Sequence, residues 1–212
     1  MDRVTMKTEA KSIIKNRVLT IFAMVLILEL VLAAVGAIPA VGFIAIILAT
    51  GPAAYAITRI FYQLAYKNKT PEFKDLIVGF EEKNFTRSFL AWIRFEVFTF
   101  LWSLLFCIPG IIKSISYSQM FYLLVDHPDM DAATAQKKSM ELMEGHKMEY
   151  FVLQLSFIPW YLLIGITFGI ASIYVMPYLQ TTMTLFYKSL TSKDKSAKET
   201  KEAKEAKALK AE

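Results

Sequence analysis

The chain has 212 residues, of which 55% are hydrophobic and only 20% are charged, and its mean hydropathy is +0.41. A soluble domain of this length is less apolar and spreads its charges along the chain, so this composition argues against one. The single cysteine, Cys107, excludes an intramolecular disulfide and a cysteine cluster for a metal. We therefore expect an all-α, polytopic helical membrane protein.

The first predicted unit spans residues 5–65. Residues 5–17 show helical spacing of apolar side chains, which predicts a short amphipathic helix on the cytoplasmic membrane surface. These apolar residues are Met6, Ala10, Ile13 and Ile14. The apolar segments Val18–Ile38 and Val41–Ala65 follow, each close to the length of about 20 residues that spans a bilayer, so residues 18–65 predict a hairpin. The first segment is long for a secretory signal and contains Glu29, which favours a retained membrane helix.

The second predicted unit spans residues 70–125. The stretch "TPEFKDLIVGF" at 70–80 predicts another surface helix, with Thr70 as its N-cap. The apolar segments Ser88–Ile108 and Ile111–Val125 predict a membrane hairpin at 88–125. The second of these segments would extend only about 22 Å as a helix, so it is either a thin span or a half-helix. Five spans therefore remain the alternative to six.

A tight turn is predicted between these two segments, at Pro109 and Gly110. Proline cannot continue a helix and glycine tolerates a turn, so this pair is expected on the outer side of the membrane. Lys113 follows within one helical turn, and its ammonium group can reach the outer headgroups. A functional role for Lys113 is the alternative.

The third predicted unit spans residues 131–190. Asp131 is the expected N-cap of a surface helix at 131–144, which ends at Gly145 and is followed by His146 and Lys147. Two apolar segments then predict a hairpin at 150–190, divided near Gly169. The remaining residues, 191–212, form a charged tail of low complexity, expected to be disordered or a single helix.

The basic residues indicate the orientation of these segments. Nearly all of them lie before the first segment, between the second and third, between the fourth and fifth, and after the sixth. The intervening turns carry none, apart from Lys113 nearby. By the positive-inside rule, six crossings place the N and C termini in the cytoplasm and the protein in the cell membrane.

Four ionisable residues, besides Lys113, lie within predicted spans: Glu29, Arg59, Arg94 and Glu96. Charged groups are costly in a bilayer and are candidates for function, so we expect an intramembrane polar network. Three interpretations are open: structural ion pairs, a proton or cation relay through Glu29, and a neutral, protonated Glu29.

Other chemistry is sparse. Asp126, His127, Asp129 and Asp131 resemble a metal-ligand cluster, but Pro128 and the capping role of Asp131 account for most of this pattern. The chain has no nucleophile elbow, zinc-protease motif, phosphate-binding loop or paired-cysteine motif. We therefore expect no enzymatic activity, no metal and no cofactor.

Several of these stretches resemble one protein family. The segment "PGIIKSISYSQMFYLLVDHPDMDAATAQKKSMELMEGHK" at 109–147 and the segment at 51–80 are similar to signature blocks of a bacterial integral-membrane family, domain of unknown function 975. The resemblance covers about residues 5–190, and Arg59, Lys113 and Gly145-His146-Lys147 fall on its signature positions. It implies a bacterial plasma-membrane protein of several spans and implies no activity, ligand or catalytic residue.

These observations favour a non-enzymatic membrane protein that acts through membrane lipids, a membrane-protein partner or a second copy of itself. Envelope stress and antimicrobial-peptide tolerance are examples of such roles, and nothing indicates nucleic-acid binding. A small-solute or ion transporter that uses Glu29 and the arginines is the second hypothesis, and an intramembrane enzyme is a third without a motif. A water-filled cavity that reaches Glu29 would favour the transporter, whereas a closed bundle would favour the first hypothesis.

Overall fold

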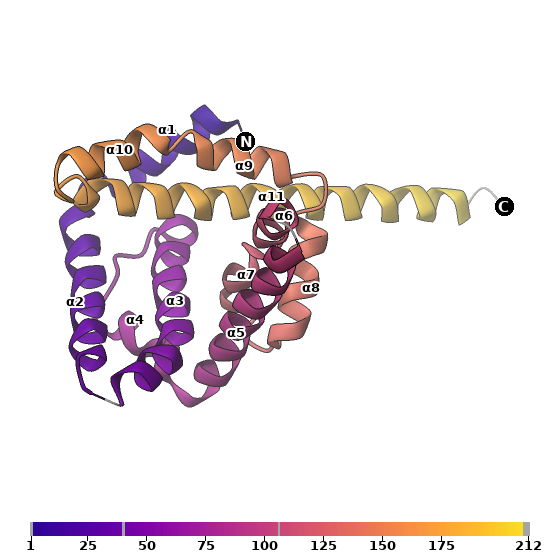
Figure 1. Ribbon diagram of the computed structural model, residues 1–212. Helices are drawn as coiled ribbons and strands as arrows, with labels where there is room; N and C mark the ends of the chain where they lie inside the picture. Colours follow the sequence, from indigo (N-terminus) through magenta and orange to yellow (C-terminus); the bar gives the residue numbers. More distant parts are fainter. Residues whose placement is uncertain (1, 40, 106, 210–212) are drawn as a thin grey trace.

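The computed structural model describes residues 2–39, 41–105 and 107–209, and all regular elements in these ranges are helices (Figure 1). Three apolar stretches within these ranges are long enough to cross a membrane: Val18–Gly36, Gly42–Lys67 and Lys147–Ile166. The expected all-α class is therefore confirmed, together with the capacity of several helices to span a bilayer.

The N-terminal helix α1 (Arg3–Ile14) packs on protein rather than presenting its apolar face outward. Met6, Ala10 and Ile14 are buried, and α1 contacts α11 and α3. The Lys7 ammonium donates a hydrogen bond to the Ser156 carbonyl at 3.1 Å, and it lies 4.3 Å from the centre of the Phe157 ring. Burial, followed by the charges of Arg3 and Lys11, lowers the pKa of Lys7. The predicted apolar face exists, but α11 and α3 pack against this helix.

Helices α2 (Val18–Gly36) and α3 (Gly42–Lys67) contact each other. They correspond to the two apolar segments predicted between residues 18 and 65. After α3, the chain is irregular until α4 (Lys74–Ile77), which continues into the 3₁₀-helix η1 (Val78–Phe80). The helical part of the predicted 70–80 element therefore starts at Lys74, and Thr70 is not its N-cap. Helix α5 (Glu82–Leu105) follows, starting six residues before the predicted segment.

The fourth apolar segment consists of two helices, α6 (Cys107–Tyr117) and α7 (Met120–Asp126). Pro109 and Gly110 lie in the first turn of α6, so the prediction that they form the turn itself is wrong. Pro109 is tolerated there because the first amides of a helix have no intrahelical acceptor. A Cβ on Gly110 would lie 3.0 Å from the Ser103 Cα, so this glycine allows α5 and α6 to approach closely.

Helix α8 (Ala132–Leu142) begins at its predicted cap. The Asp131 carboxylate accepts hydrogen bonds from the backbone amides of Ala133 at 2.9 Å and Thr134 at 3.2 Å. The predicted stop, Gly145, has φ 77°, in the left-handed region that favours glycine.

We expect Asp131→Ala to lower the free energy of unfolding by about 1 kcal/mol at pH 7, the usual value of an N-cap. Hydrogen bonds from Thr134 hold the pKa of the Asp131 carboxyl below its ordinary value. Its contribution is therefore present above the unfolded-state pKa of about 3.9 and is lost as the pH falls through the lower folded-state pKa. Thermal unfolding of wild type and variant between pH 3 and 7 measures this, and a constant difference at every pH would contradict it.

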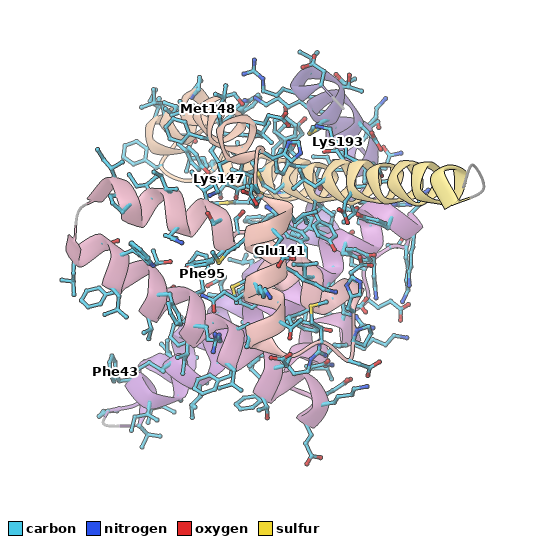
Figure 2. All side chains as sticks on the ribbon, turned by 90° about the vertical axis from the view of Figure 1, so that its right-hand side faces the viewer. Phe43, Phe95, Glu141, Lys147, Met148 and Lys193 are labelled. Atoms are coloured by element: carbon cyan, nitrogen blue, oxygen red, sulfur yellow. The ribbon has the colours of Figure 1, made fainter. Side chains whose placement is uncertain are left out.

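The last helices are α9 (Lys147–Leu155), α10 (Ile158–Ile166) and α11 (Ser172–Leu209). Pro159 lies in the first turn of α10, where proline is favoured, and α10 therefore begins there as a helix separate from α9. Figure 1 shows α11 lying across α2 and α3, which it contacts, and then extending beyond the rest of the chain toward the C-terminus. In Figure 2, Phe43 at the start of α3 lies toward the opposite side from the far end of α11.

The core forms around α11. Residues 181–187 of this helix are all buried, and helices that are buried on every side lie inside a larger bundle. The largest fully buried side chains include Tyr55, Phe61, Tyr178 and Tyr187, from α3 and α11. Because α11 also contacts α1, α2 and α8, it joins the N-terminal helices to the C-terminal part of the chain.

Candidate functional site

The four ionisable residues predicted to form an intramembrane network are separated in the structure. Glu29 and Glu96 are exposed, on α2 and α5. The Arg94 guanidinium donates from Nε to Gln136 Oε1 at 2.9 Å and lies 5.4 Å from the centre of the Phe98 ring. Arg59 is partly buried, and its Nε has no hydrogen-bond partner among the described residues. In that part of the chain, no ion pair joins these residues to one another.

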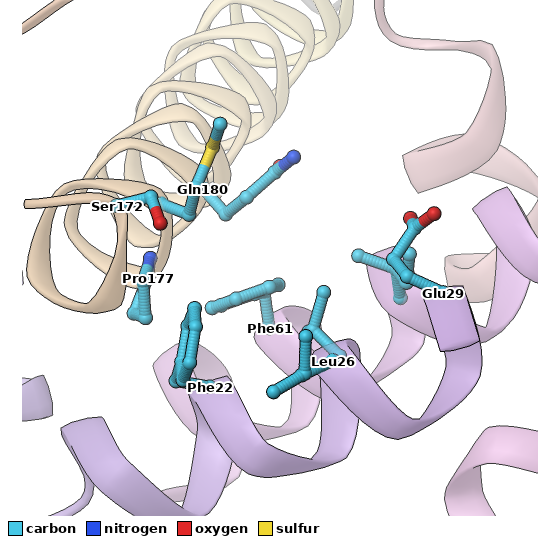
Figure 3. Close-up of a pocket in the computed structure, with 10 residues that line it drawn as sticks. Phe22, Leu26, Glu29, Phe61, Ser172, Pro177 and Gln180 are labelled. Carbon is cyan, nitrogen blue, oxygen red and sulfur yellow. The ribbon is translucent and has the colours of Figure 1, made fainter. Parts of the chain in front are cut away.

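Glu29 instead lies at one end of a groove between α2, α3 and α11, with a volume of about 320 Å³. Figure 3 shows Phe22 and Pro177 away from Glu29, with Phe61 between α2 and α11. Seven of the lining residues are apolar: Phe22, Val25, Leu26, Ile57, Phe61, Met176 and Pro177. Ser172 and Gln180 of α11 supply the other polar groups.

Local sequence explains one wall of this groove. Phe22, Val25, Leu26 and Glu29 are spaced i, i+3, i+4 and i+7, so they share one face of α2. The opposite wall depends on α11 crossing this face, which no local pattern specifies. The result is an apolar groove with a single carboxylate at its end, and Glu29 makes no hydrogen bond or ion pair within the described residues.

The predicted turn and surface motif lies at two places. The Lys113 ammonium lies 4.8 Å from the centre of the Trp102 ring, so it pairs α6 with α5. Gly145 turns the chain after α8, and His146 is the N-cap residue of α9, with Nδ1 3.3 Å from Glu149 Oε2. Lys147 is the first residue of α9. These residues lie at contacts and turns between helices, and they do not line a common cavity.

A cluster around Asp126, at the end of α7, was not predicted from the sequence. The hydroxyl of Tyr187 on α11 donates to Asp126 Oδ2 at 2.9 Å, and the hydroxyl of Tyr62 on α3 donates to Oδ1. Tyr66 stacks on Tyr62 with ring centres 4.2 Å apart, and Tyr122 stacks on Tyr187 at 5.3 Å. The spacing of Tyr62 and Tyr66 marks one face of α3, but no sequence pattern pairs that face with α7 and α11.

We expect Tyr187→Phe to reduce the free energy of unfolding by about 1.5–3 kcal/mol, the usual contribution of a hydrogen bond to a charged group. The change leaves the ring stacking in place and removes only the hydroxyl. A double-mutant cycle with Asp126→Asn measures the coupling, because Tyr187→Phe should cost much less when the carboxylate is absent. Equal costs in both backgrounds would show that the two side chains do not interact.

The metal-ligand pattern at residues 126–131 does not form a site. Asp126 is held by tyrosines, Asp131 caps α8, and Asp129 lies 3.1 Å from the Lys83 ammonium. Within the described ranges, no three His, Cys, Asp or Glu side chains are placed to hold a metal ion.

Over the described residues, the fold is all-helical, with three apolar helical stretches long enough to cross a membrane and an apolar groove between α2, α3 and α11. A family model described as "Protein of unknown function (DUF975)" matches residues 1–116 and 104–194, so the chain belongs to this family. The resemblance inferred from the sequence motifs is therefore confirmed. No curated protein and no solved structure matches the chain.

Proposed function

We propose that this chain is a multi-pass protein of the cell membrane, with six membrane segments in three hairpins and cytoplasmic termini. In this proposal it acts by binding lipid and has no catalytic activity. The groove between α2, α3 and α11 is the lipid site. The three candidate spans, the positive-inside pattern and the apolar groove support this function.

Exposed apolar side chains on the candidate spans support the membrane assignment. Leu19 is 73% exposed, Phe43 is 75% exposed and Ile166 is 76% exposed, and many of their neighbours on the same helices are exposed as well. Soluble monomers rarely expose apolar surface over such lengths, because hydrating it is unfavourable. Lipid acyl chains would cover these faces without that cost.

The lining of the groove is the observation that carries lipid binding. Phe22, Leu26 and Phe61 present hydrocarbon surface, and polar atoms occur mainly at Glu29 and Gln180. A hydrocarbon chain fits such a lining, whereas an ion or proton pathway needs a continuous series of polar or hydrated groups. Lipid binding therefore agrees with the groove better than ion transport does.

Lipid analysis of the purified full-length protein tests this function. After exchange into detergent and washing, we expect native mass spectrometry to detect at least one retained phospholipid on the wild type. Ile57→Trp fills the groove and should reduce that lipid several-fold. Ile44→Trp is the matched control on the exposed side of α3, and it should retain the lipid.

Val25→Phe is a second variant that fills the groove. Thermal unfolding is measured for every variant, so that a variant that loses the lipid but keeps the unfolding temperature of the wild type shows loss of binding and not loss of folding. A wild-type protein that retains no lipid, or equal retention by the Ile57 and Ile44 variants, would overturn the proposed function.

The transporter hypothesis has one observation in its favour, which is that a cavity does reach Glu29. If Glu29 carries a proton or cation, Glu29→Gln should abolish uptake by proteoliposomes while expression stays unchanged. Uptake equal to that of the wild type would remove the relay role of Glu29.

A further inference from the structure

A second cavity lies next to the Asp126 cluster, between the end of α7, the polar helix α8 and the distal part of α11. Its volume is about 460 Å³, within the range of small-molecule sites. The titratable lining residues come from three helices and one connection: Asp126, His127, Lys138, Glu141, Tyr187 and Asp194. None of these residues lies in a stretch that qualifies as a candidate span.

The acidic side of the cavity is preorganised. Tyr62 and Tyr187 each donate a hydroxyl to one oxygen of Asp126, so the carboxylate is fixed by α3 and α11. A carboxylate has about four acceptor positions, and two phenols leave some of them open to a ligand. Glu141 adds a second carboxylate from α8, and Asp194 adds a third from α11.

Basic groups line the same cavity. Lys138 lies one helical turn before Glu141 on α8, so both side chains leave the same face of that helix. His127 lies next to Asp126, with its Nδ1 3.9 Å from Asp126 Oδ2, and half of its side chain is exposed. The cavity therefore presents the Lys138 ammonium beside three carboxylates, of which that of Asp126 is held in place by two tyrosines. Lys138 would repel a purely cationic ligand, and Asp126 and Glu141 would repel a purely anionic one.

We propose that this cavity binds a small zwitterion that carries an ammonium group and a phosphate ester. The ammonium is held by Asp126 and Glu141, and the phosphate by Lys138. In the proposed topology, the end of α7 and all of α8 lie at the cytoplasmic membrane surface, where the headgroup of an aminophospholipid has this chemistry. A soluble phosphorylated amine has the same chemistry, and the experiment distinguishes the two sources.

Phosphoethanolamine is the probe for the purified full-length protein in detergent. We expect it to raise the unfolding temperature saturably, and to do so at a concentration at least tenfold lower than ethanolamine alone or inorganic phosphate alone. Lys138→Met and Glu141→Gln should each weaken this response at least tenfold. Their neighbours Lys137 and Glu144 are exposed and do not line the cavity, so Lys137→Met and Glu144→Gln are matched controls.

Nanodiscs distinguish the source of the ligand. If phosphatidylethanolamine nanodiscs suppress the response to free phosphoethanolamine and phosphatidylglycerol nanodiscs do not, the site binds a lipid headgroup. An equal response in both indicates a soluble ligand, and either result supports the zwitterion site. No saturable response, a response to phosphate alone at equal concentration, or unchanged binding by the Lys138 and Glu141 variants would overturn it. Because no groove residue is changed, failure here leaves the lipid groove proposal unaffected.

Discussion

Gly79→Ala is expected to destabilise the protein by about 2–3 kcal/mol, the upper part of the range for overpacking a core. Gly79 lies in η1, where a Cβ would be 2.0 Å from the carbonyl oxygen of Pro52 and 2.8 Å from its carbonyl carbon. These are backbone atoms of α3 and cannot rotate away, so α3 and η1 must separate. The expected readout is a lower unfolding temperature of the detergent-purified protein, followed by the fluorescence of its tryptophans.

Gly165→Ala is the matched control for this substitution. Gly165 lies in α10, and a Cβ built there meets nothing within 4 Å. Alanine is favoured over glycine in a helix by about 1 kcal/mol, so this variant should be as stable as the wild type or more stable. If Gly79→Ala and Gly165→Ala shifted the unfolding temperature in the same direction, the close packing of η1 on α3 would be refuted.

Arg87→Lys is expected to cost about 2–3 kcal/mol, although it preserves the charge. The Arg87 guanidinium donates from Nε to the Met130 carbonyl at 2.8 Å, and from Nη2 to the carbonyls of Leu124 and His127, each at 3.0 Å. It thereby joins the start of α5 to the end of α7 and the connection before α8. Lysine has no planar fork and cannot reach these three acceptors together, and hydrogen bonds to charged groups each contribute about 1.5–3 kcal/mol.

Lys83→Met, one helical turn earlier on α5, is the control for Arg87→Lys. Its ammonium pairs with Asp129 at 3.1 Å, but both side chains are largely exposed, and such pairs contribute about 0–1 kcal/mol. Limited proteolysis adds a local readout, since loss of the Arg87 contacts should expose the connection at residues 127–131 to cleavage. Equal stability of the Lys83 and Arg87 variants, with no new cleavage, would show that Arg87 does not hold this connection.

Some patterns that depend on neighbours along the chain were read correctly from the sequence, although the cap at Thr70 and the turn at Pro109 and Gly110 were not. The helical spacing of Met6, Ala10, Ile13 and Ile14 identified the apolar face of α1, which was expected on the membrane surface and is packed on protein, and Asp131 was identified as the N-cap of α8. Both follow from distances within one or two helical turns, which the backbone geometry of a helix determines. What covers the α1 face was not predictable, because that depends on where α11 lies.

The contacts of the ionisable residues could not be predicted from the sequence. The expected network of Glu29, Arg59, Arg94 and Glu96 assumed that charges at similar depths meet one another. In the structure, Arg94 donates to the neutral side chain of Gln136 on α8, and Glu29 lies at the end of an apolar groove. Any acceptor brought near by helix packing can satisfy a guanidinium, so charge and depth alone do not select the partner.

The Asp126 cluster was missed for the same reason. Its members are separated by about 60 residues along the chain on either side, on α3, α7 and α11. The sequence pattern around Asp126 resembled a metal-ligand cluster but was attributed mainly to Pro128 and the Asp131 cap, and it gave no sign of the tyrosine hydroxyls that α3 and α11 bring to Asp126.

Long apolar segments, which are stable only where hydrocarbon or protein covers them, were sufficient to predict an all-helical chain with stretches able to span a membrane, and the sequence motifs were sufficient to predict the family. Which helices pack against one another was visible only in the folded chain, and this packing forms the groove at Glu29, the hydrogen bonds of Arg87 and the cavity beside Asp126. The physical reason is that apolar packing is non-directional and permits many helix arrangements, whereas each polar contact forms only after one arrangement has brought its two groups within about 3 Å.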